Sequence, residues 1–144
     1  QKVQQLLQEA INQHNIRVEM NFPPDGADVL ASRIEIEQVV FNLFKNSIDS
    51  LTSSRTESPL IRVHVHPLND RFFEIHVRDN GPGVDGAIVD DIFKPYVTNK
   101  QTGLGMGLSI SQTIIEGHGG RLTLVGPAEP GSCFRFTLSR FLNE

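Results

Sequence analysis

Three short segments of this chain concentrate residue types that could do chemistry. The segment 42–46 (NLFKN) offers two carboxamides, 79–83 (DNGPG) a carboxylate followed by glycines, and 103–109 (GLGMGLS) a glycine run before an apolar-periodic stretch. Carboxamide oxygens suit Mg²⁺, a carboxylate accepts hydrogen bonds from amino groups, and backbone amides at a helix N-terminus bind phosphate. In this order, the segments predict a nucleotide site with places for a metal, the polar edge of a base and a phosphate.

The first segment lies in a predicted helix over residues 32–51. At 100° per residue, Asn42, Asn46 and Asp49 share a polar stripe beside a broad apolar face. Asn is a mediocre helix former, so two of them inside one helix need a reason, and metal binding supplies one. Lys45 lies off the stripe, but its stem is long enough to reach a phosphate. A solvated polar face is the competing interpretation.

The second segment ends a predicted strand over 72–79 with the carboxylate of Asp79. Gly81 and Gly83 allow the backbone to turn tightly and to approach a ligand. The competing interpretation is an ordinary turn, in which Asp and Gly are common. The match of 81–86 to G-x-G-x-x-G is not a dinucleotide fingerprint, because only a short helix is expected after it.

The third segment opens a predicted helix over 107–117. Three glycines alternate before it: Gly103, Gly105 and Gly107. The segment lacks G-x-x-x-x-G-K-[ST], so it is not a P-loop. The preceding residues, 94–107, are predicted to form a mobile loop on which Lys100 could close over a terminal phosphate. A surface loop with solvated lysines is the competing interpretation.

Hydrophobic periodicity predicts the elements that position these segments. Helices are expected over 2–14, 32–51, 88–93 and 107–117, and strands over 16–22, 60–66, 72–79, 121–125 and 132–139. Ser32 followed by Glu35 is typical of a capping box at the start of the second helix. The elements predict an α+β fold, a two-layer α/β sandwich in which a mixed five-stranded sheet is covered on one face by three helices.

Composition limits the classes of protein. The 144 residues suit one domain, and the net charge of −4 argues against a nucleic-acid partner. No apolar run of membrane-spanning length is present, so no direct membrane contact is expected. The single cysteine, Cys133, is interpreted as a packed strand residue. The start at Gln1, inside an apparent helix, predicts a fragment of a longer protein.

The histidines do not indicate a second site. His64 and His66 alternate along one predicted strand and would share a face of the sheet. No cysteine or third ligand accompanies them in the sequence, so we expect no metal site there. His118 ends the 107–117 helix, where a cation would suit the helix dipole.

The three segments resemble the N, G1 and G2 boxes of sensor histidine kinases. These kinases belong to the GHKL superfamily, which includes gyrase B, the heat-shock ATPase chaperones and the mismatch-repair ATPases. The segment 92–96 (IFKPY) looks like the F box, and 37–39 (EQV), 118–120 (HGG) and 131–134 (GSCF) also match. The resemblance covers residues 2–140. It implies the Bergerat fold, with ATP as ligand and Mg²⁺ as metal.

The resemblance also implies roles for single residues. Asn46 is similar to the residue that ligates Mg²⁺, and Asn42 and Lys45 resemble residues near the phosphates, which makes these three the candidate catalytic residues. Asp79 looks like the carboxylate that bonds the adenine amino group. The other implied nucleotide-binding positions are Asp49, Gly81, Gly83, Val84, Phe93, Tyr96, Thr98, Lys100, Gly103, Leu104, Gly105, Met106, Gly107 and Leu108.

One departure from the wider superfamily bears on the reaction. Relatives that hydrolyse ATP or phosphorylate serine usually carry Glu where this chain has Asn42, and Asn cannot act as a base at neutral pH. This favours in-line transfer of the γ-phosphoryl group to a histidine supplied by another domain. The alternatives are a stand-alone serine kinase of the anti-sigma-factor type and a non-catalytic nucleotide-binding regulatory module.

The resemblance implies partners as well. The first is the protein's own dimerisation and histidine phosphotransfer domain, which is missing from this chain. The second is the receiver domain of a response regulator. The isolated domain is expected to be a monomer in the cytoplasm, even where the parent is anchored in the inner membrane.

Overall fold

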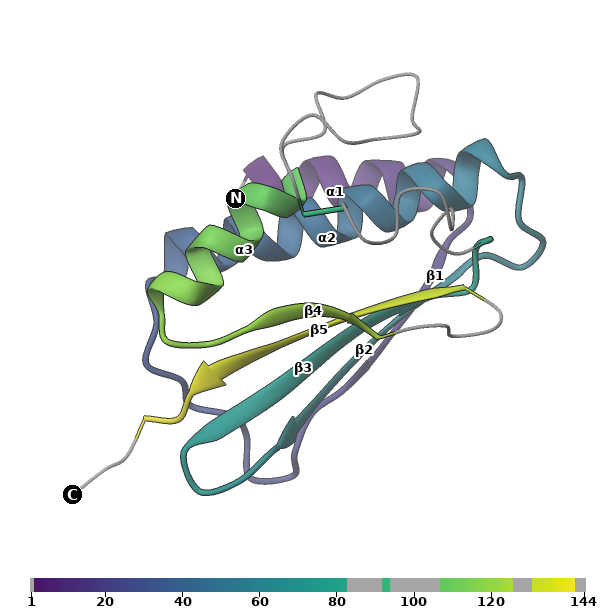
Figure 1. Cartoon of the computed structure of the whole chain (residues 1–144). Helices are drawn as coiled ribbons and strands as arrows, with labels where there is room; N and C mark the ends of the chain where they lie inside the picture. The colour runs from purple at the N-terminus through teal and green to yellow at the C-terminus, as the bar shows by residue number, and fades with distance from the viewer. Residues whose placement is uncertain (1, 83–91, 94–106, 126–130, 142–144) are drawn as a thin grey trace.

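The chain folds into one mixed sheet with a layer of helices on one side (Figure 1). The computed structural model describes residues 2–82, 92–93, 107–125 and 131–141. Its elements are α1 (Lys2–Gln13), β1 (Arg17–Asn21), α2 (Arg33–Ser53), β2 (Leu60–Pro67), β3 (Phe72–Asp79), α3 (Gly107–Gly117), β4 (Leu122–Val125) and β5 (Ser132–Ser139). The predicted sandwich of five strands and three helices is confirmed.

The sheet has the strand order β1-β2-β3-β5-β4, which puts β3 at its centre. Only β1 and β2 are parallel, and the other neighbours are antiparallel, so the sheet is mixed as predicted. The hairpin of β2 and β3 pairs His66 with Glu74 and His64 with His76. The pairing of β3 with β5 sets Asp79 opposite Ser132.

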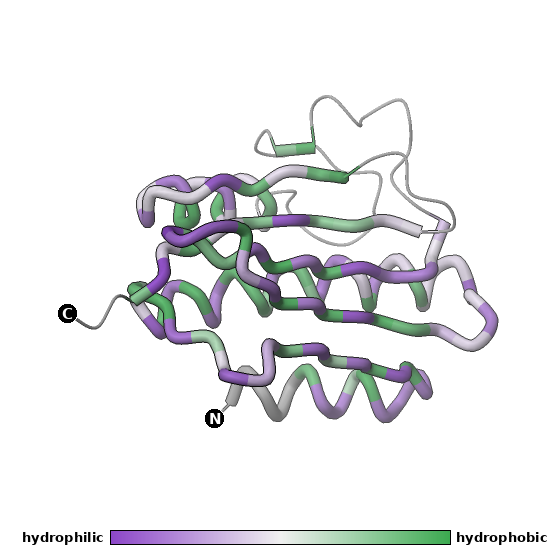
Figure 2. Tube along the Cα trace, turned by 90° about the horizontal axis from the view of Figure 1, so that it is seen from below, coloured by the Kyte–Doolittle hydropathy of each residue, from purple (hydrophilic) through white to green (hydrophobic). Residues whose placement is uncertain are grey.

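The core lies between the sheet and the helices because each strand alternates in polarity. In β3, Phe73, Ile75 and Val77 are buried and alternate with polar residues. Figure 2 shows this alternation as green and purple bands along the strands. From α2, Val39 and Leu43 are fully buried, and Val40 is partly buried. Such alternation is what one covered and one open sheet face require.

The start of α2 differs from the predicted capping box. Ser32 is the N-cap, and its side chain accepts a bond of 3.4 Å from the amide of Glu35. The reciprocal bond is replaced by one from the Ser32 amide to Nε2 of His118, at 3.0 Å. Nδ1 of His118 lies 2.8 Å from the Ile114 carbonyl, so Nδ1 donates and Nε2 accepts. The ring therefore bridges α2 and α3 through hydrogen bonds of both its nitrogens.

The length and apolarity of a helix decide whether it could span a membrane. Among the helices that the structure describes, none combines the length and apolarity needed to span a lipid bilayer.

Gly131, directly before β5, has positive φ (+106°) and packs against the backbone of Asp79. A Cβ there would overlap the carbonyl oxygen of Asp79, whereas Gly26, with a φ of +80°, has open space around it. We predict that Gly26→Ala lowers the free energy of unfolding by about 1–2 kcal/mol through backbone strain alone. Gly131→Ala should cost about 1–3 kcal/mol more, because the backbone must also move.

Urea unfolding of both variants measures this difference. Equal losses for the two variants would contradict the close approach at Gly131.

Candidate functional site

The carboxylate of Asp79 is buried at the end of β3. It follows Phe73, Ile75 and Val77 on the covered face of the sheet, and it is only 2% exposed. Its Oδ2 accepts a hydrogen bond of 2.9 Å from the hydroxyl of Ser132, and its Oδ1 one of 2.9 Å from the amide of Gly81. A buried carboxylate needs such partners to offset its lost hydration. The carboxylate is thus held in one orientation before any ligand arrives.

The turn after Asp79 is held by Asn80, whose role sequence reasoning missed. The side-chain oxygen of Asn80 accepts from the amide of Leu60 at 2.8 Å, and its nitrogen donates to the carbonyl of Ser58 at 3.0 Å. Both bonds tie the end of β3 to the segment before β2. Ser132 was also missed as a partner, although it lies in the 131–134 motif. A polar pair from different strands cannot be found without the strand register.

Gly81 brings this turn against α2. A Cβ on Gly81 would lie 3.0 Å from Oγ of Ser50 and 3.1 Å from Oδ1 of Asp79. Both separations are tighter than ordinary contacts, so the absence of a side chain allows the turn to lie this close to the helix. The glycine predicted to shape a base pocket therefore lies between the buried carboxylate and α2.

Asn42 joins α2 to α3. Its side-chain nitrogen donates to the carbonyl of Gly107 at 3.2 Å and lies 3.1 Å from Oγ of Ser111, while its oxygen accepts from Gln38 at 3.0 Å. Ser111 is fully buried, so this link is part of the packed interface between the helices. Asn42 thereby fixes the first turn of α3 beside α2.

Asn42, Asn46 and Ser50 follow one another at intervals of four residues along α2, which puts them on one face of the helix. Gly107, from the third predicted segment, contacts Asn42 at one end of this row. Gly81, from the second, packs against Ser50 at the other end. The row of 42, 46 and 50 therefore joins the described parts of all three segments, with the partly buried Asn46 between them.

The charged residues of α2 pair with each other. Nζ of Lys45 lies 3.2 Å from Oδ2 of Asp49, with 54% and 32% of these side chains exposed. An exposed pair of this kind contributes little to stability, since water competes for both charges. Lys45 can leave Asp49 for another anion at small cost.

Two further predicted residues pack at the core. The ring of Phe93 meets that of Phe134 edge to face, with 6.2 Å between the centroids. Leu108 packs in the first turn of α3 as a partly buried residue. Gly107 has its nearest neighbour for an added Cβ, on Asn42, at 3.7 Å, an ordinary contact, so steric crowding by the described residues does not demand glycine there.

The remaining predicted site residues lie outside the described part of the chain. They are Gly83, Val84, Tyr96, Thr98, Lys100, Gly103, Leu104, Gly105 and Met106. All of the expected loop over 94–107 except Gly107, and most of the expected helix over 88–93, fall there too, so these expectations stay predictions. The assignment of a metal to Asn46 and of phosphates to Asn42 and Lys45 is a prediction as well.

Comparison with known proteins identifies the family. Residues 31–141 match the model of the histidine kinase-, DNA gyrase B- and HSP90-like ATPases. The sensor protein FixL of Bradyrhizobium diazoefficiens is 37% identical over 126 residues, covering 88% of this chain and 25% of FixL. The sensor protein TdiS of Thauera aromatica is 40% identical over 129 residues, covering 89% of this chain and 24% of TdiS. The chain thus spans about a quarter of these curated relatives.

A solved structure agrees with the sequence comparison. The nucleotide-free catalytic domain of histidine kinase ThkA matches with a TM-score of 0.80 and 30% identity, covering 96% of this chain and 88% of that one. The chain therefore belongs to the family of histidine kinase-, DNA gyrase B- and HSP90-like ATPases, as a nucleotide-binding domain of the sensor histidine kinase type.

Proposed function

We propose that residues 1–144 form the catalytic and ATP-binding domain of a longer, two-component sensor kinase. The domain binds Mg-ATP and directs its γ-phosphoryl group to a histidine on a separate dimerisation and phosphoacceptor domain. The observation that carries this proposal is the row of Asn42, Asn46 and Ser50 on α2, which joins the buried carboxylate of Asp79 at one end to the start of α3 at the other.

Asp79 has the properties that recognition of adenine requires. Each of its oxygens accepts one bond from the protein, so lone pairs are left for an exocyclic amino group. Since the carboxylate is already desolvated and oriented, a ligand that donates to it loses little further hydration or freedom on binding. A base lacking an amino group at that edge would leave the buried charge without this bond.

The middle of the row suits a metal, and the end at Asn42 suits phosphate. The carboxamide of Asn46 offers a hard oxygen for Mg²⁺, which on binding would offset the negative charge of the phosphates. The first turn of α3 is a helix N-terminus, where the backbone amides and the helix dipole attract anions. Among the described residues, the exposed Lys45 pairs with Asp49, and it can turn its ammonium group toward a phosphate.

Asn42 supports transfer to histidine over transfer to serine. Serine needs a base to remove its proton, whereas an imidazole attacks with a lone pair it already has. The side-chain amide nitrogen of Asn42 donates to the Gly107 carbonyl. A carboxylate at position 42 would instead place one acceptor beside another, the Gly107 carbonyl oxygen. The side chain at position 42 thus holds α3 in place. The imidazole that attacks the phosphoryl group owes its reactivity to groups other than Asn42.

The partners and location follow from the same proposal. The acceptor histidine belongs to the parent's own dimerisation domain, and a response-regulator receiver domain takes the phosphoryl group next. Both steps occur in the cytoplasm, whether or not the parent is anchored in a membrane. The isolated domain carries no acceptor and is proposed to be a monomer.

We predict that Asp79→Ala weakens Mg-ADP binding by roughly 10- to 100-fold. The loss of one hydrogen bond to a charged group is worth about 1.5–3 kcal/mol, which corresponds to that range. Calorimetric titration measures the affinity, and circular dichroism verifies the fold. Asp70→Ala, an exposed carboxylate in the turn between β2 and β3, is the matched control and should bind normally. Equal affinities for both variants would rule out Asp79 as the base contact.

Asn46→Ala should remove the dependence of ADP binding on Mg²⁺. Titrations with Mg²⁺ and with a chelator give the gain in affinity from the metal for each protein. We expect a clear gain for the unchanged chain and almost none for the variant, because the variant lacks the carboxamide oxygen. A variant that keeps the full gain would show that another residue holds the metal.

The amino acid that receives phosphate separates the two kinase hypotheses. The chain is incubated with labelled ATP and, in parallel, with a histidine-bearing acceptor domain of a sensor kinase and with serine-bearing anti-sigma-antagonist proteins. We expect label that is lost in acid and kept in base, as a phosphoramidate is. Acid-stable label on serine would favour the stand-alone serine kinase, and nucleotide binding without any transfer would favour the regulatory module.

A further inference from the structure

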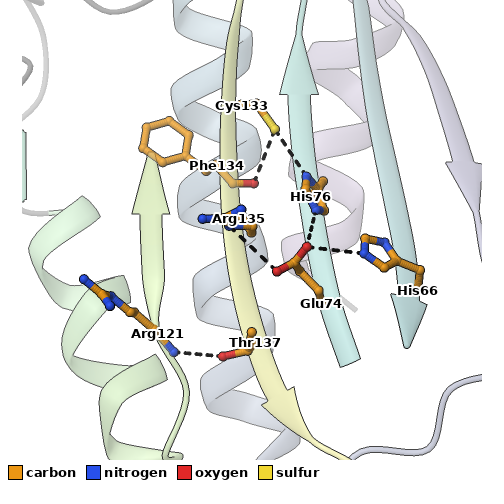
Figure 3. A network of polar contacts seen from close by, with 8 residues as sticks. All are labelled: His66, Glu74, His76, Arg121, Cys133, Phe134, Arg135 and Thr137. Carbon is orange, nitrogen blue, oxygen red and sulfur yellow. Dashed lines mark hydrogen bonds and ion pairs between the residues drawn. The ribbon is translucent and has the colours of Figure 1, made fainter. Parts of the chain in front are cut away.

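A cluster of titratable side chains lies on the open face of the sheet, away from the helices (Figure 3). Glu74 is its centre, with only 12% of its side chain exposed. Oε1 of Glu74 lies 2.8 Å from Nε2 of His76 and 3.3 Å from Nε2 of His66. Two ring nitrogens and one carboxylate oxygen thus converge on one point, and all lie within 4.8 Å of one another.

The register of the β2–β3 hairpin creates this cluster. His66 is directly opposite Glu74, and His76 is two residues further along β3 on the same face. In sequence, His66 had no visible third ligand, because the third ligand comes from the neighbouring strand. The expectation that no metal site exists around His66 rested on that missing ligand, and the structure supplies it.

The separations fit a transition-metal ion. Two ligands that each lie about 2.1 Å from a tetrahedral ion are roughly 3.4 Å apart. The two distances from Glu74, 2.8 and 3.3 Å, are close to this value, and all three ligand atoms lie within 4.8 Å of one another, so the imidazole rings have to rotate to bring both nitrogens to ligand distance. Imidazole and carboxylate are common protein ligands of Zn²⁺, with a fourth position left for water.

The surroundings orient the ligands. Nδ1 of His76 lies 3.7 Å from the sulfur of Cys133, whose own hydrogen points to the Phe134 carbonyl at 3.9 Å. A proton on Nδ1 of His76 can therefore face the sulfur, which leaves Nε2 free to bind an ion. Nε of Arg135 lies 3.8 Å from Oε2 of Glu74, on the side away from the histidines.

Cys133 itself is not a ligand. It is 1% exposed, and burial raises the pKa of its thiol, so the thiolate form that binds metal is disfavoured. Its sulfur contacts Nδ1 of His76 and so helps to orient the imidazole ring.

The cluster lacks one polar interaction. Nδ1 of His66 is buried without a hydrogen-bond partner, the one such side-chain atom among the described residues. All polar contact of this ring is therefore on the side of Glu74. An ion at Nε2 would give this ring a further anchor on the side of Glu74, while Nδ1 would still have no partner among the described residues.

We propose that His66, Glu74 and His76 form a binding site for a transition-metal dication such as Zn²⁺. The ion binds Nε2 of each neutral imidazole, whose proton then lies on Nδ1, and it takes the place of the contacts between Nε2 and Glu74. Arg62 on β2, Arg78 on β3 and Arg135 on β5 oppose a cation, as His64 would when protonated, so the site favours an ion that imidazole binds strongly over Mg²⁺. Bound metal clamps β2 to β3.

Calorimetric titration of the nucleotide-free chain with Zn²⁺, in excess Mg²⁺, tests this site. We expect one ion per chain, with the affinity lowered roughly 10- to 100-fold or more by His66→Ala, Glu74→Gln or His76→Ala, since even outer-shell changes have such effects. His14→Ala removes an exposed histidine that is distant in sequence from His66, Glu74 and His76, and it should not alter binding. No binding by the unchanged chain, or equal loss in the His14 variant, overturns the proposal.

Two further measurements keep the test independent of folding defects. Zn²⁺ should raise the melting temperature of the unchanged chain and of His14→Ala, but not of Glu74→Gln, which keeps the shape of the side chain. Co²⁺ should give visible absorption bands without a sulfur-to-metal charge-transfer band. A melting temperature of Glu74→Gln that rises as much as that of the unchanged chain, or a sulfur band abolished by Cys133→Ser, would refute the three-ligand assignment.

Discussion

The buried carboxylate of Asp79 is the constraint around which this fold is arranged. It occupies the position on β3 where another apolar core residue would otherwise follow Val77. Because such a charge is costly to bury, the chain must bring it donors, and they come from Ser132 on β5 and from the amide of Gly81. The close approach of Gly131 is part of the same arrangement, since a side chain there would push β5 away.

Much of the fold could be predicted from local pattern. The alternation in β3 and β5 marks both strands at their observed bounds, and apolar spacing marks α3. The capping box was half right, because the amide of Ser32 bonds instead to His118, a residue 86 positions away. Periodicity reports which face of an element is apolar, but it carries no information about which distant polar group will meet it.

The residues of the candidate site also differ in whether local sequence could reveal them. Asn42, Asp79 and Gly81 could be singled out because their types and neighbours are unusual for a helix or a strand end. Their partners Ser132, Ser111 and Ser50 could not, since serine is common and its meaning depends on register. The histidine cluster also depends on register, because scanning one strand at a time does not bring together His66 on β2 with Glu74 and His76 on β3.

The place of β5 inside the sheet has a consequence for biosynthesis. β5 lies between β3 and β4, yet it is made after every other strand of the sheet. Until it emerges from the ribosome, β3 has an unpaired edge and Asp79 lacks the Ser132 hydroxyl. Pairings between residues far apart in sequence also form slowly. The nascent chain therefore carries an unpaired edge on its central strand, β3, until β5 is made. Its tendency to aggregate is greatest just before synthesis of this domain is complete.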